Sequence, residues 1–169
     1  MEKVYFIIPA YNESEAIRQV LEEWYPVVES CGQESRLVVI DDGSKDNTYA
    51  ILTEFAQTHP QVVPVTKPNG GHGATILFGY RYALQQGADY IFQTDSDGQT
   101  NPAEFPAFWE QRKAYDMVIG YRNKRQDGIS RIFVTKVLKL VILLCFGANV
   151  KDANTPFRLM KAETLAKYM

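Results

Sequence analysis

Three side chains with the chemistry of metal ligands stand at alternate positions near the middle of the chain. Asp95, Asp97 and Gln99 follow the apolar run 90–92. Alternate residues of an extended segment point the same way, so two carboxylates and an amide oxygen would converge. Carboxylates this close resist joint ionisation, and a divalent cation such as Mg²⁺ or Mn²⁺ removes that conflict. The alternative is a turn that caps a helix beginning at Pro102, but the position at a strand end favours a metal site.

Polar, glycine-rich or charged residues also follow the other apolar runs, which are 4–8, 37–40, 62–65 and 117–119. After the second run come Asp41 and Asp42. Carboxylates there can accept from a ribose hydroxyl or a base N–H, or one of the two can cap the next helix; we expect one to do structural work and the other to contact a ligand. The glycines of segment 70–73 allow close backbone approach to a ligand before a helix, or they make only a tight turn. Tyr11, after the first run, either packs on a nucleobase or is a surface aromatic residue.

Three arginines are candidate phosphate partners, because a guanidinium pairs with phosphate oxygens in a bidentate way. They are Arg122, Arg131 and Arg158. Arg158 is the strongest candidate, since it lies in the polar segment 152–158 between two apolar helical patterns. His72 is interpreted as a loop residue without a predicted role.

The spacing excludes three other motifs. An EF-hand loop that starts at Asp95 would need Gly at its sixth position and Glu at its twelfth, where this chain has Thr100 and Pro106. The nucleophile turn of haloacid-dehalogenase-type phosphatases would follow the first strand and would place Thr or Val at position 99. Segment 70–73 lacks the Lys-Ser/Thr ending of a Walker loop.

The elements that would position these side chains alternate between short apolar runs and helical patterns. Helices are predicted over 15–28, 48–58, 74–86, 102–112, 130–146 and 162–169, and Gly87 is the expected C-cap of the third. Pro9 is expected to stop the first strand. Repeated strand–helix units indicate an α/β fold with a mostly parallel sheet, in which ligands bind beyond the carboxyl ends of the strands.

The composition agrees with one globular domain. The 169 residues are 46% hydrophobic and 22% charged, with a net charge of -2, so neither a disordered chain nor a basic nucleic-acid-binding protein is indicated. The two cysteines, Cys31 and Cys145, are too far apart for a zinc ribbon or a disulfide scaffold, and a reducing compartment fits them. We find no secretory signal. We expect no transmembrane helix, because the most apolar stretch, 132–146, contains Lys136 and Lys139.

The predicted helix 130–146 joins basic residues to many apolar ones. Such a helix can lie in a membrane interface next to a lipid substrate. It can equally pack on the sheet or in a homo-oligomer, and the sequence leaves both alternatives open.

The ordered set of segments 9–13, 41–44, 69–73, 95–99 and 157–158 resembles the inverting glycosyltransferases of family 2, which have the GT-A fold. Within that family the chain looks most like the branch of dolichol-phosphate mannose synthase and polyprenyl-phosphate glycosyltransferases. The resemblance covers essentially the whole chain. It implies one catalytic domain over 1–169, with a nucleotide-binding part at 1–100 and an acceptor-side part at 101–169.

The resemblance also implies roles for single residues. Asp95, Ser96 and Asp97 would meet the donor diphosphate through Mg²⁺ or Mn²⁺, and Gln99 would complete the metal shell. Asp97, Arg122 and Arg158 would serve catalysis, and Arg131 would also meet phosphate. The residues that would hold the nucleoside of a UDP- or GDP-sugar are Pro9, Tyr11, Glu13, Ile40 and Asp42.

Two departures from the family pattern stand beside these matches. Gly98 and Gln99 stand where many relatives have Leu-Gln or Leu-Ser. Thr155 and Pro156 stand where relatives have Ser-Gly, so the family pattern does not carry over to the approach of that loop to the acceptor.

A polyprenyl phosphate is the implied acceptor, and an anionic phosphate needs no general base. A saccharide hydroxyl would need one, and Asp152 is a loose candidate. One alternative is therefore transfer to a hydroxyl in cell-envelope polysaccharide synthesis, and another is a nucleotide-sugar-binding domain without turnover. Relatives continue further, so we interpret the chain as truncated at its C-terminus. The expected location is cytoplasmic, peripheral at the cytoplasmic face of the membrane.

Overall fold

A computed structural model describes residues 2–120 and 155–169. The predicted helix 130–146, Arg122, Arg131 and Asp152 lie outside these residues. Strands and helices alternate along the first part of the chain, as the apolar periodicity predicts. The elements are β1 (Val4–Ala10), α1 (Ile17–Ser30), β2 (Arg36–Asp41), α2 (Thr48–Ala56), β3 (Val62–Thr66), α3 (His72–Gln85), β4 (Tyr90–Gln93), the 3₁₀ turn η1 (Pro102–Glu104), α4 (Phe105–Gln111), β5 (Met117–Ile119), β6 (Arg158–Lys161) and α6 (Ala162–Ala166).

The six strands form one sheet in the order β3-β2-β1-β4-β6-β5. β1 is parallel to both β2 and β4, and β2 is parallel to β3, which confirms the α/β fold with a mostly parallel sheet. β6 was not predicted. It runs antiparallel to β4, and Gln93 at the carboxyl end of β4 lies opposite Arg158 at the start of β6. This pairing therefore brings Arg158 to the edge of the sheet where the parallel strands end.

The prediction that Pro9 ends the first strand is wrong. β1 continues through Pro9 to Ala10, and Pro9 lies opposite Ile40 of β2. In a parallel strand, residues bond alternately to one neighbour and the other. The carbonyl of Ala10 bonds to β2 through Asp42 N, whereas that of Ile7 accepts from Thr94 on the β4 side. Pro9 shares the side of Ile7, where β4 has already ended, so its missing N–H costs no ladder bond.

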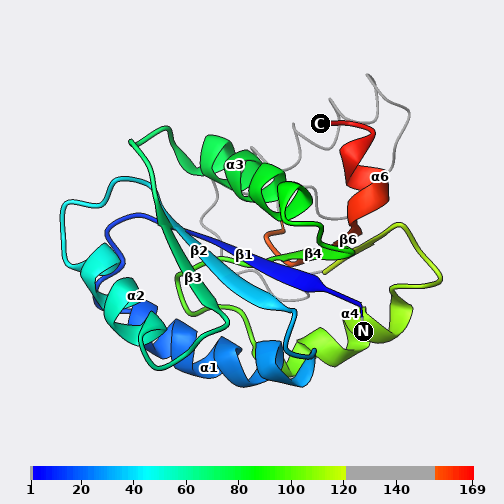
Figure 1. The fold of residues 1–169 in the computed structure, drawn as a ribbon, viewed down its shortest axis with the longest axis horizontal. Helices are drawn as coiled ribbons and strands as arrows, with labels where there is room; N and C mark the ends of the chain where they lie inside the picture. Colours follow the sequence, from blue (N-terminus) through cyan, green and yellow to red (C-terminus); the bar gives the residue numbers. More distant parts are fainter. Residues whose placement is uncertain (1, 121–154) are drawn as a thin grey trace, which may run out of the picture. The chain divides into compact units, whose positions relative to one another are not determined.

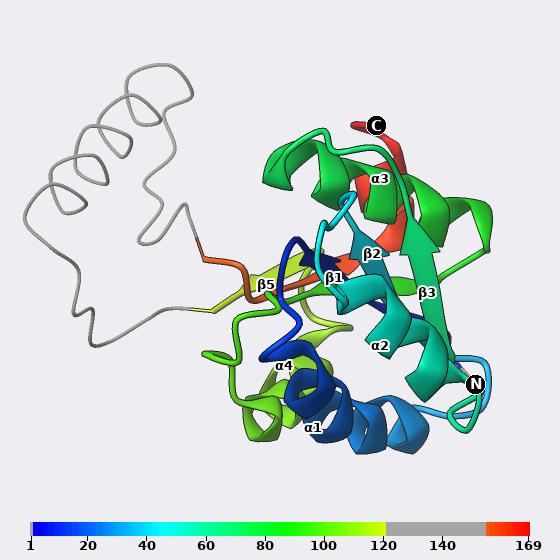
Figure 2. The ribbon, with the colours of Figure 1, turned by 90° about the vertical axis from the view of Figure 1, so that its left-hand side faces the viewer.

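Helices cover both faces of the sheet. In Figure 1, α1, α2 and α4 lie below the strands and α3 and α6 above them, and Figure 2 shows the same layers from the side. Alternate residues of β1 serve the two faces. Phe6 and Ile8 pack with Trp24 of α1 and with α2 and α4, whereas Tyr5 and Ile7 pack with Tyr80 and Ala83 of α3 and with Leu165 of α6. The β2 run of Leu37–Ile40 is completely buried, as a strand covered on both faces requires.

Several helix boundaries differ from the predicted ones by a few residues. α1 and α3 each begin two residues from the predicted start, and the predicted 102–112 helix divides into η1 and α4. The third helix ends just before Gly87, as predicted. Gly87 has a φ of +71°, and its N–H donates to the carbonyl of Leu84, as expected for a glycine that ends a helix.

The chain divides into two compact units, one of residues 1–118 and 157–169 and the other of residues 119–156. The first contains β1 to β4, β6 and the described helices. Within the described ranges, no helix has the length and apolar character that crossing a bilayer requires.

Candidate functional site

A cavity of about 440 Å³ opens at the carboxyl ends of β1, β2 and β4. The predicted convergence of residues from several strand ends is therefore present in the structure. Its lining includes seven of the residues predicted for the site, and these are Pro9, Tyr11, Glu13, Asp42, Asp95, Ser96 and Asp97. Ala10, Asn69, Gly71, His72 and Thr75 complete the lining.

Three of the predicted site residues are described but do not line the cavity. Ile40 is fully buried in the core between the sheet and α3. Gln99 and Arg158 are also absent from the lining. Arg158 lies close enough to Tyr80 for its charge to lower the pKa of that phenol, although burial outweighs this effect and raises the pKa of Tyr80 to about 12.

The loop after β1 is fixed by the loop after β2. Asn12 has a φ of +55°, and its side-chain oxygen accepts from Lys45 N at 2.8 Å. In return, Asn12 N donates to Ser44 Oγ at 2.9 Å. Glu13 N donates to Thr48 Oγ1 at 2.8 Å, which ties the same loop to the start of α2. These reciprocal bonds hold Tyr11 and Glu13 at the mouth of the cavity.

The two adjacent carboxylates after β2 both have structural partners. Asp41 accepts from Ser44 N at 3.2 Å and from Thr66 Oγ1 at 2.8 Å, so it joins the turn after β2 to β3. This agrees with the expectation that one of the pair does structural work. The capping of α2, however, involves Asp46, which accepts from Thr48 N at 3.0 Å and from Thr48 Oγ1.

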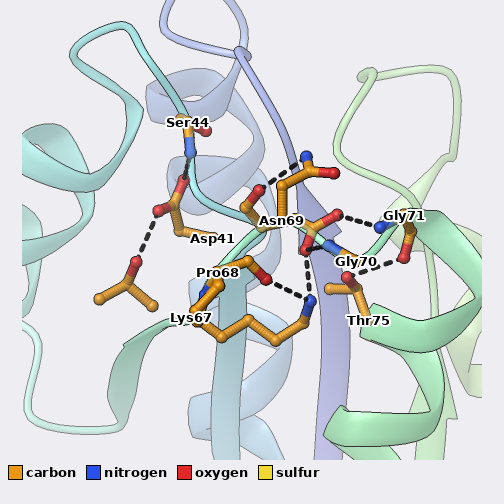
Figure 3. A network of polar contacts seen from close by, with 10 residues as sticks. Asp41, Ser44, Lys67, Pro68, Asn69, Gly70, Gly71 and Thr75 are labelled. Atoms are coloured by element: carbon orange, nitrogen blue, oxygen red, sulfur yellow. Dashed lines mark hydrogen bonds and ion pairs between the residues drawn. The ribbon is translucent and has the colours of Figure 1, made fainter.

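Asp42 holds the glycine-rich loop that leads to α3 at Gly70 and Gly71, which are labelled in Figure 3. Its carboxylate accepts from Gly70 N at 2.9 Å and from Gly71 N at 2.8 Å, and it forms a short ion pair with Lys67 Nζ. Burial alone would raise the pKa of Asp42, but these donors outweigh it and hold the pKa below its usual value. The side chain of Asp42 is 5% exposed and that of Lys67 is 13% exposed. The pair is therefore a buried clamp on the loop, in addition to lining the cavity.

The remaining carboxylates give the cavity a strongly negative character. Burial raises the pKa of Glu13, and the nearby charges of Asp97 and Asp95 raise it further, whereas a hydrogen bond from Ser96 lowers it. Together with Asp42, whose charge is offset by its ion pair with Lys67, four carboxylates line the cavity, and no Lys or Arg is among its described lining residues. An anionic ligand such as a diphosphate would be repelled here unless a cation came with it.

The segment that follows β4 turns sharply, so the predicted convergence of alternate side chains over 95–99 is not formed. Gly98 has a φ of +69°, and Gln99 N donates to Asp97 Oδ1 at 3.0 Å. Thr94 Oγ1 donates to Thr100 Oγ1 at 2.8 Å and closes the base of this turn. Asp95 and Asp97 still reach the cavity, whereas Gln99 acts through its backbone.

The donor set fits a hard divalent cation, since carboxylate oxygens are the ligands that Mg²⁺ and Mn²⁺ prefer. Among residues 2–120 and 155–169, however, no three His, Cys, Asp or Glu side chains are grouped closely enough to hold a metal ion without further ligands. Cations of this kind usually take one or two protein carboxylates and complete their shell with substrate phosphates and water. Asp95 and Asp97 supply that smaller number.

Sequence reasoning missed His72. It is the first residue of α3, it lines the cavity, and its Nε2 lies 3.8 Å from Asp95 Oδ1. The available signal was its place directly after Gly70 and Gly71, at the exit of a predicted strand.

Known proteins share this architecture and sequence pattern. The chain is 31% identical over 162 residues to the undecaprenyl-phosphate 4-deoxy-4-formamido-L-arabinose transferase of Klebsiella pneumoniae, a match that covers 94% of this chain and 48% of that protein. It is 30% identical over 176 residues to a dolichyl-phosphate beta-glucosyltransferase of Trichomonas vaginalis, with 94% and 51% covered. The chain thus spans about half the length of these relatives.

The structure of glucosyl-3-phosphoglycerate synthase from Mycobacterium tuberculosis, determined with Mn²⁺, UDP-glucose and phosphoglyceric acid, superposes with a TM-score of 0.71. The match covers 97% of this chain and 58% of that protein at 20% identity, so it supports the likeness in fold. The family model for glycosyl transferase family 2 matches residues 5–168, which is nearly the whole chain. Because this match spans nearly the whole chain and every described cavity residue, the chain belongs to glycosyl transferase family 2.

Proposed function

We propose that this chain is the catalytic domain of an inverting glycosyltransferase that moves a sugar from a nucleoside-diphosphate sugar to a polyprenyl phosphate. The family match supports the transferase chemistry. The observation that carries the proposal is the cavity at the strand ends, where the residues after β1, β2 and β4 meet. Two relatives are named as an undecaprenyl-phosphate transferase and a dolichyl-phosphate glucosyltransferase, and these names support a polyprenyl phosphate as the acceptor.

The charges in the cavity support a donor that binds together with a divalent cation. A nucleoside diphosphate is itself anionic, and the described lining offers carboxylates without Lys or Arg. Asp95 and Asp97 are the residues that would hold Mg²⁺ or Mn²⁺. When bound, such an ion neutralises the charge that develops on the leaving diphosphate.

The other lining residues would bind the nucleoside. Tyr11 is 43% exposed at the cavity mouth and offers its ring to a base, while Pro9 and Ala10 form the apolar floor at the end of β1. Glu13 can accept from a hydroxyl group. Asp42 serves the nucleoside mainly through the loop that it holds, because three donors already occupy its carboxylate.

A phosphate acceptor carries its own negative charge, so the attack on the sugar needs no proton transfer to a base. Arg158, at the edge of the sheet where β4 ends, is the described candidate for binding that phosphate. Arg122 and Arg131 are further candidates for binding this phosphate. We also propose that the protein lies peripherally at the cytoplasmic face of the membrane, where it would meet a polyprenyl phosphate.

Isothermal titration of the purified chain with UDP and with GDP, with and without Mn²⁺, tests the donor part of the proposal. We expect one nucleotide to bind only with the cation, and Asp97→Asn to weaken that binding at least tenfold. Asp116→Asn is the matched control, because Asp116 is a 65% exposed carboxylate outside the cavity that pairs with Lys161. Binding that is equally strong without a cation would refute the assignment of the site.

The acceptor part has its own test. Release of the nucleoside diphosphate from a panel of nucleotide sugars should depend on added polyprenyl phosphate. Release that depends instead on a saccharide acceptor would identify a hydroxyl as the acceptor. Nucleotide binding without any release, in a protein extended to the length of its relatives, would indicate a binding domain.

A further inference from the structure

The side-chain amide of Asn69 is a polar group of the cavity whose orientation the protein itself fixes. Asn69 lies in the loop before α3 and lines the cavity. Its Nδ2 donates to the backbone carbonyl of Asp42 at 2.9 Å, and Figure 3 shows the amide in this network. A carbonyl only accepts hydrogen bonds, so the amino end of the amide must face it. Oδ1 therefore points away from this carbonyl, and within the described ranges no hydrogen bond reaches it.

The backbone at Asn69 is held closely on both sides. Gly43 has a φ of +69°, and a methyl group at this position would come within 2.9 Å of Asn69 N, so the turn after β2 packs directly against the loop. The next two residues, Gly70 and Gly71, donate their N–H groups to the carboxylate of Asp42. Asn69 is thus placed before any ligand arrives, and a group that is already ordered loses little entropy on binding.

The other polar side chains around this loop are already engaged. Three donors occupy the carboxylate of Asp42, and Thr75 Oγ1 donates to the carbonyl of Gly71 at 3.0 Å. Tyr11 lines the same cavity and offers a ring for a base to stack on, but a ring face does not distinguish one base from another. The amide of Asn69 is therefore the group of this loop that can read the edge of a base.

We propose that Asn69 selects the base of the sugar donor. Oδ1 and the second hydrogen of Nδ2 form an edge with one acceptor and one donor, which complements an N–H next to a C=O. Uracil and thymine carry this pair at N3 and C4, and guanine carries it at N1 and C6. This inference rests on the proposed function, and it restricts the donors to UDP-, dTDP- or GDP-sugars.

The same edge rejects cytosine and adenine. In the same pose, these bases turn a ring nitrogen, which is an acceptor, toward Oδ1 and an amino group toward Nδ2, so that like groups meet at both positions. The amide of Asn69 does not turn over to suit them, because Oδ1 would then face the carbonyl of Asp42 and lose the bond at 2.9 Å. Selection of this kind depends on the unfavourable contacts as much as on the favourable ones.

Matched pairs of nucleotides isolate the contribution of the base edge. UDP and CDP share the ribose, the diphosphate and a pyrimidine ring, and GDP and ADP share the first two and a purine ring. Isothermal titration with Mn²⁺ would measure the ratio of affinities within each pair for the wild-type chain, Asn69→Ala and Asn47→Ala. Asn47 is the matched control, because it is an exposed asparagine outside the cavity whose side chain makes no capping bond to α2. A general disturbance of the loop would weaken both members of a pair equally and leave the ratio unchanged.

We expect the wild-type chain to bind UDP about tenfold or more tightly than CDP, or GDP about tenfold or more tightly than ADP. Asn47→Ala should keep this ratio, and Asn69→Ala should reduce it to about threefold or less. Equal affinities within both pairs, a preference for CDP or ADP, or a ratio that survives Asn69→Ala would overturn this inference and leave the proposed function standing. The wild-type ratios can refute it even if Asn69→Ala does not fold. If no nucleotide bound with Mn²⁺, the proposed donor site and this inference would both be wrong.

Discussion

The buried pair of Asp42 and Lys67 gives a sharp prediction about stability. Asp42→Asn keeps the shape of the side chain, removes its charge and leaves the ammonium of Lys67, 13% exposed, without its counter-ion. Removing one member of a buried ion pair typically costs about 3–5 kcal/mol, because the other charge stays buried and uncompensated. The new amide group also turns a donor toward the N–H groups of Gly70 and Gly71. We therefore expect Asp42→Asn to lower the free energy of unfolding by about 3–5 kcal/mol.

Asp41→Asn is the matched comparison. Asp41 is buried to the same degree, at 2% exposed against 3% for Asp42. It accepts from the backbone N–H of Ser44 and the hydroxyl of Thr66, which are neutral donors. An asparagine keeps one acceptor there, and the hydroxyl of Thr66 can turn to accept from the new amide. We expect this variant to lose about 1–2 kcal/mol.

The stability that the pair of Asp42 and Lys67 contributes should decrease as the pH falls. The pKa of Asp42 in the folded chain lies below its usual value, so the folded state binds this proton more weakly than the unfolded chain does. The contribution of the pair is therefore complete above the unfolded pKa of about 4, and it is lost as the pH falls through the lower folded pKa. The difference in the free energy of unfolding between the wild-type chain and Asp42→Asn should be constant from pH 5 to 7 and should become smaller below pH 4.

Urea unfolding followed by circular dichroism measures these differences, with the slope against urea checked to be equal among the variants. A loss below about 1 kcal/mol for Asp42→Asn, or a loss equal to that of Asp41→Asn, would refute the claim that a charge clamp holds the loop.

Substitutions at two further positions probe how the site is supported. A methyl group at Gly79 would overlap the side chains of Ile7 and Ile40, so Gly79→Ala should move α3 away from the sheet and cost about 1–3 kcal/mol in urea unfolding; an unchanged midpoint would contradict this close packing. Asn12→Ala should cost about 1–2 kcal/mol, because it loses the bond to Lys45 N and leaves alanine at a positive φ. Asn12→Gly should be less costly than Asn12→Ala in thermal unfolding, and the reverse order would exclude the backbone contribution.

The sequence allowed the helices, the parallel strands and the place of the site to be predicted, because these follow from local patterns. Apolar residues at helical spacing identify α1, and the continuous run of β2 identifies a strand buried on both faces. Parallel strands then bring their carboxyl ends to one edge, so Asp42 and Asp95 could be expected to meet at one cavity without knowledge of any side-chain contact.

The features that were missed depend on contacts between distant segments. β6 is only four residues long, and its pairing with β4 joins residues 158 and 93. Pro9 remains in β1 only because β4 ends before it, which the sequence around Pro9 does not show. The turn at Gly98 could have been suspected from the glycine, but the place of His72 beside Asp95 depends on the clamp between Asp42 and the glycine-rich loop.

We propose above that a divalent cation and a nucleoside diphosphate bind together at the ends of β1, β2 and β4. Crystals grown with Mn²⁺ and UDP or GDP, with diffraction data collected at the manganese absorption edge, test it most directly. We expect one strong anomalous peak beside Asp95 and Asp97, in contact with the diphosphate. A nucleotide bound in the cavity without a peak there, or a peak bound to other residues, would contradict it.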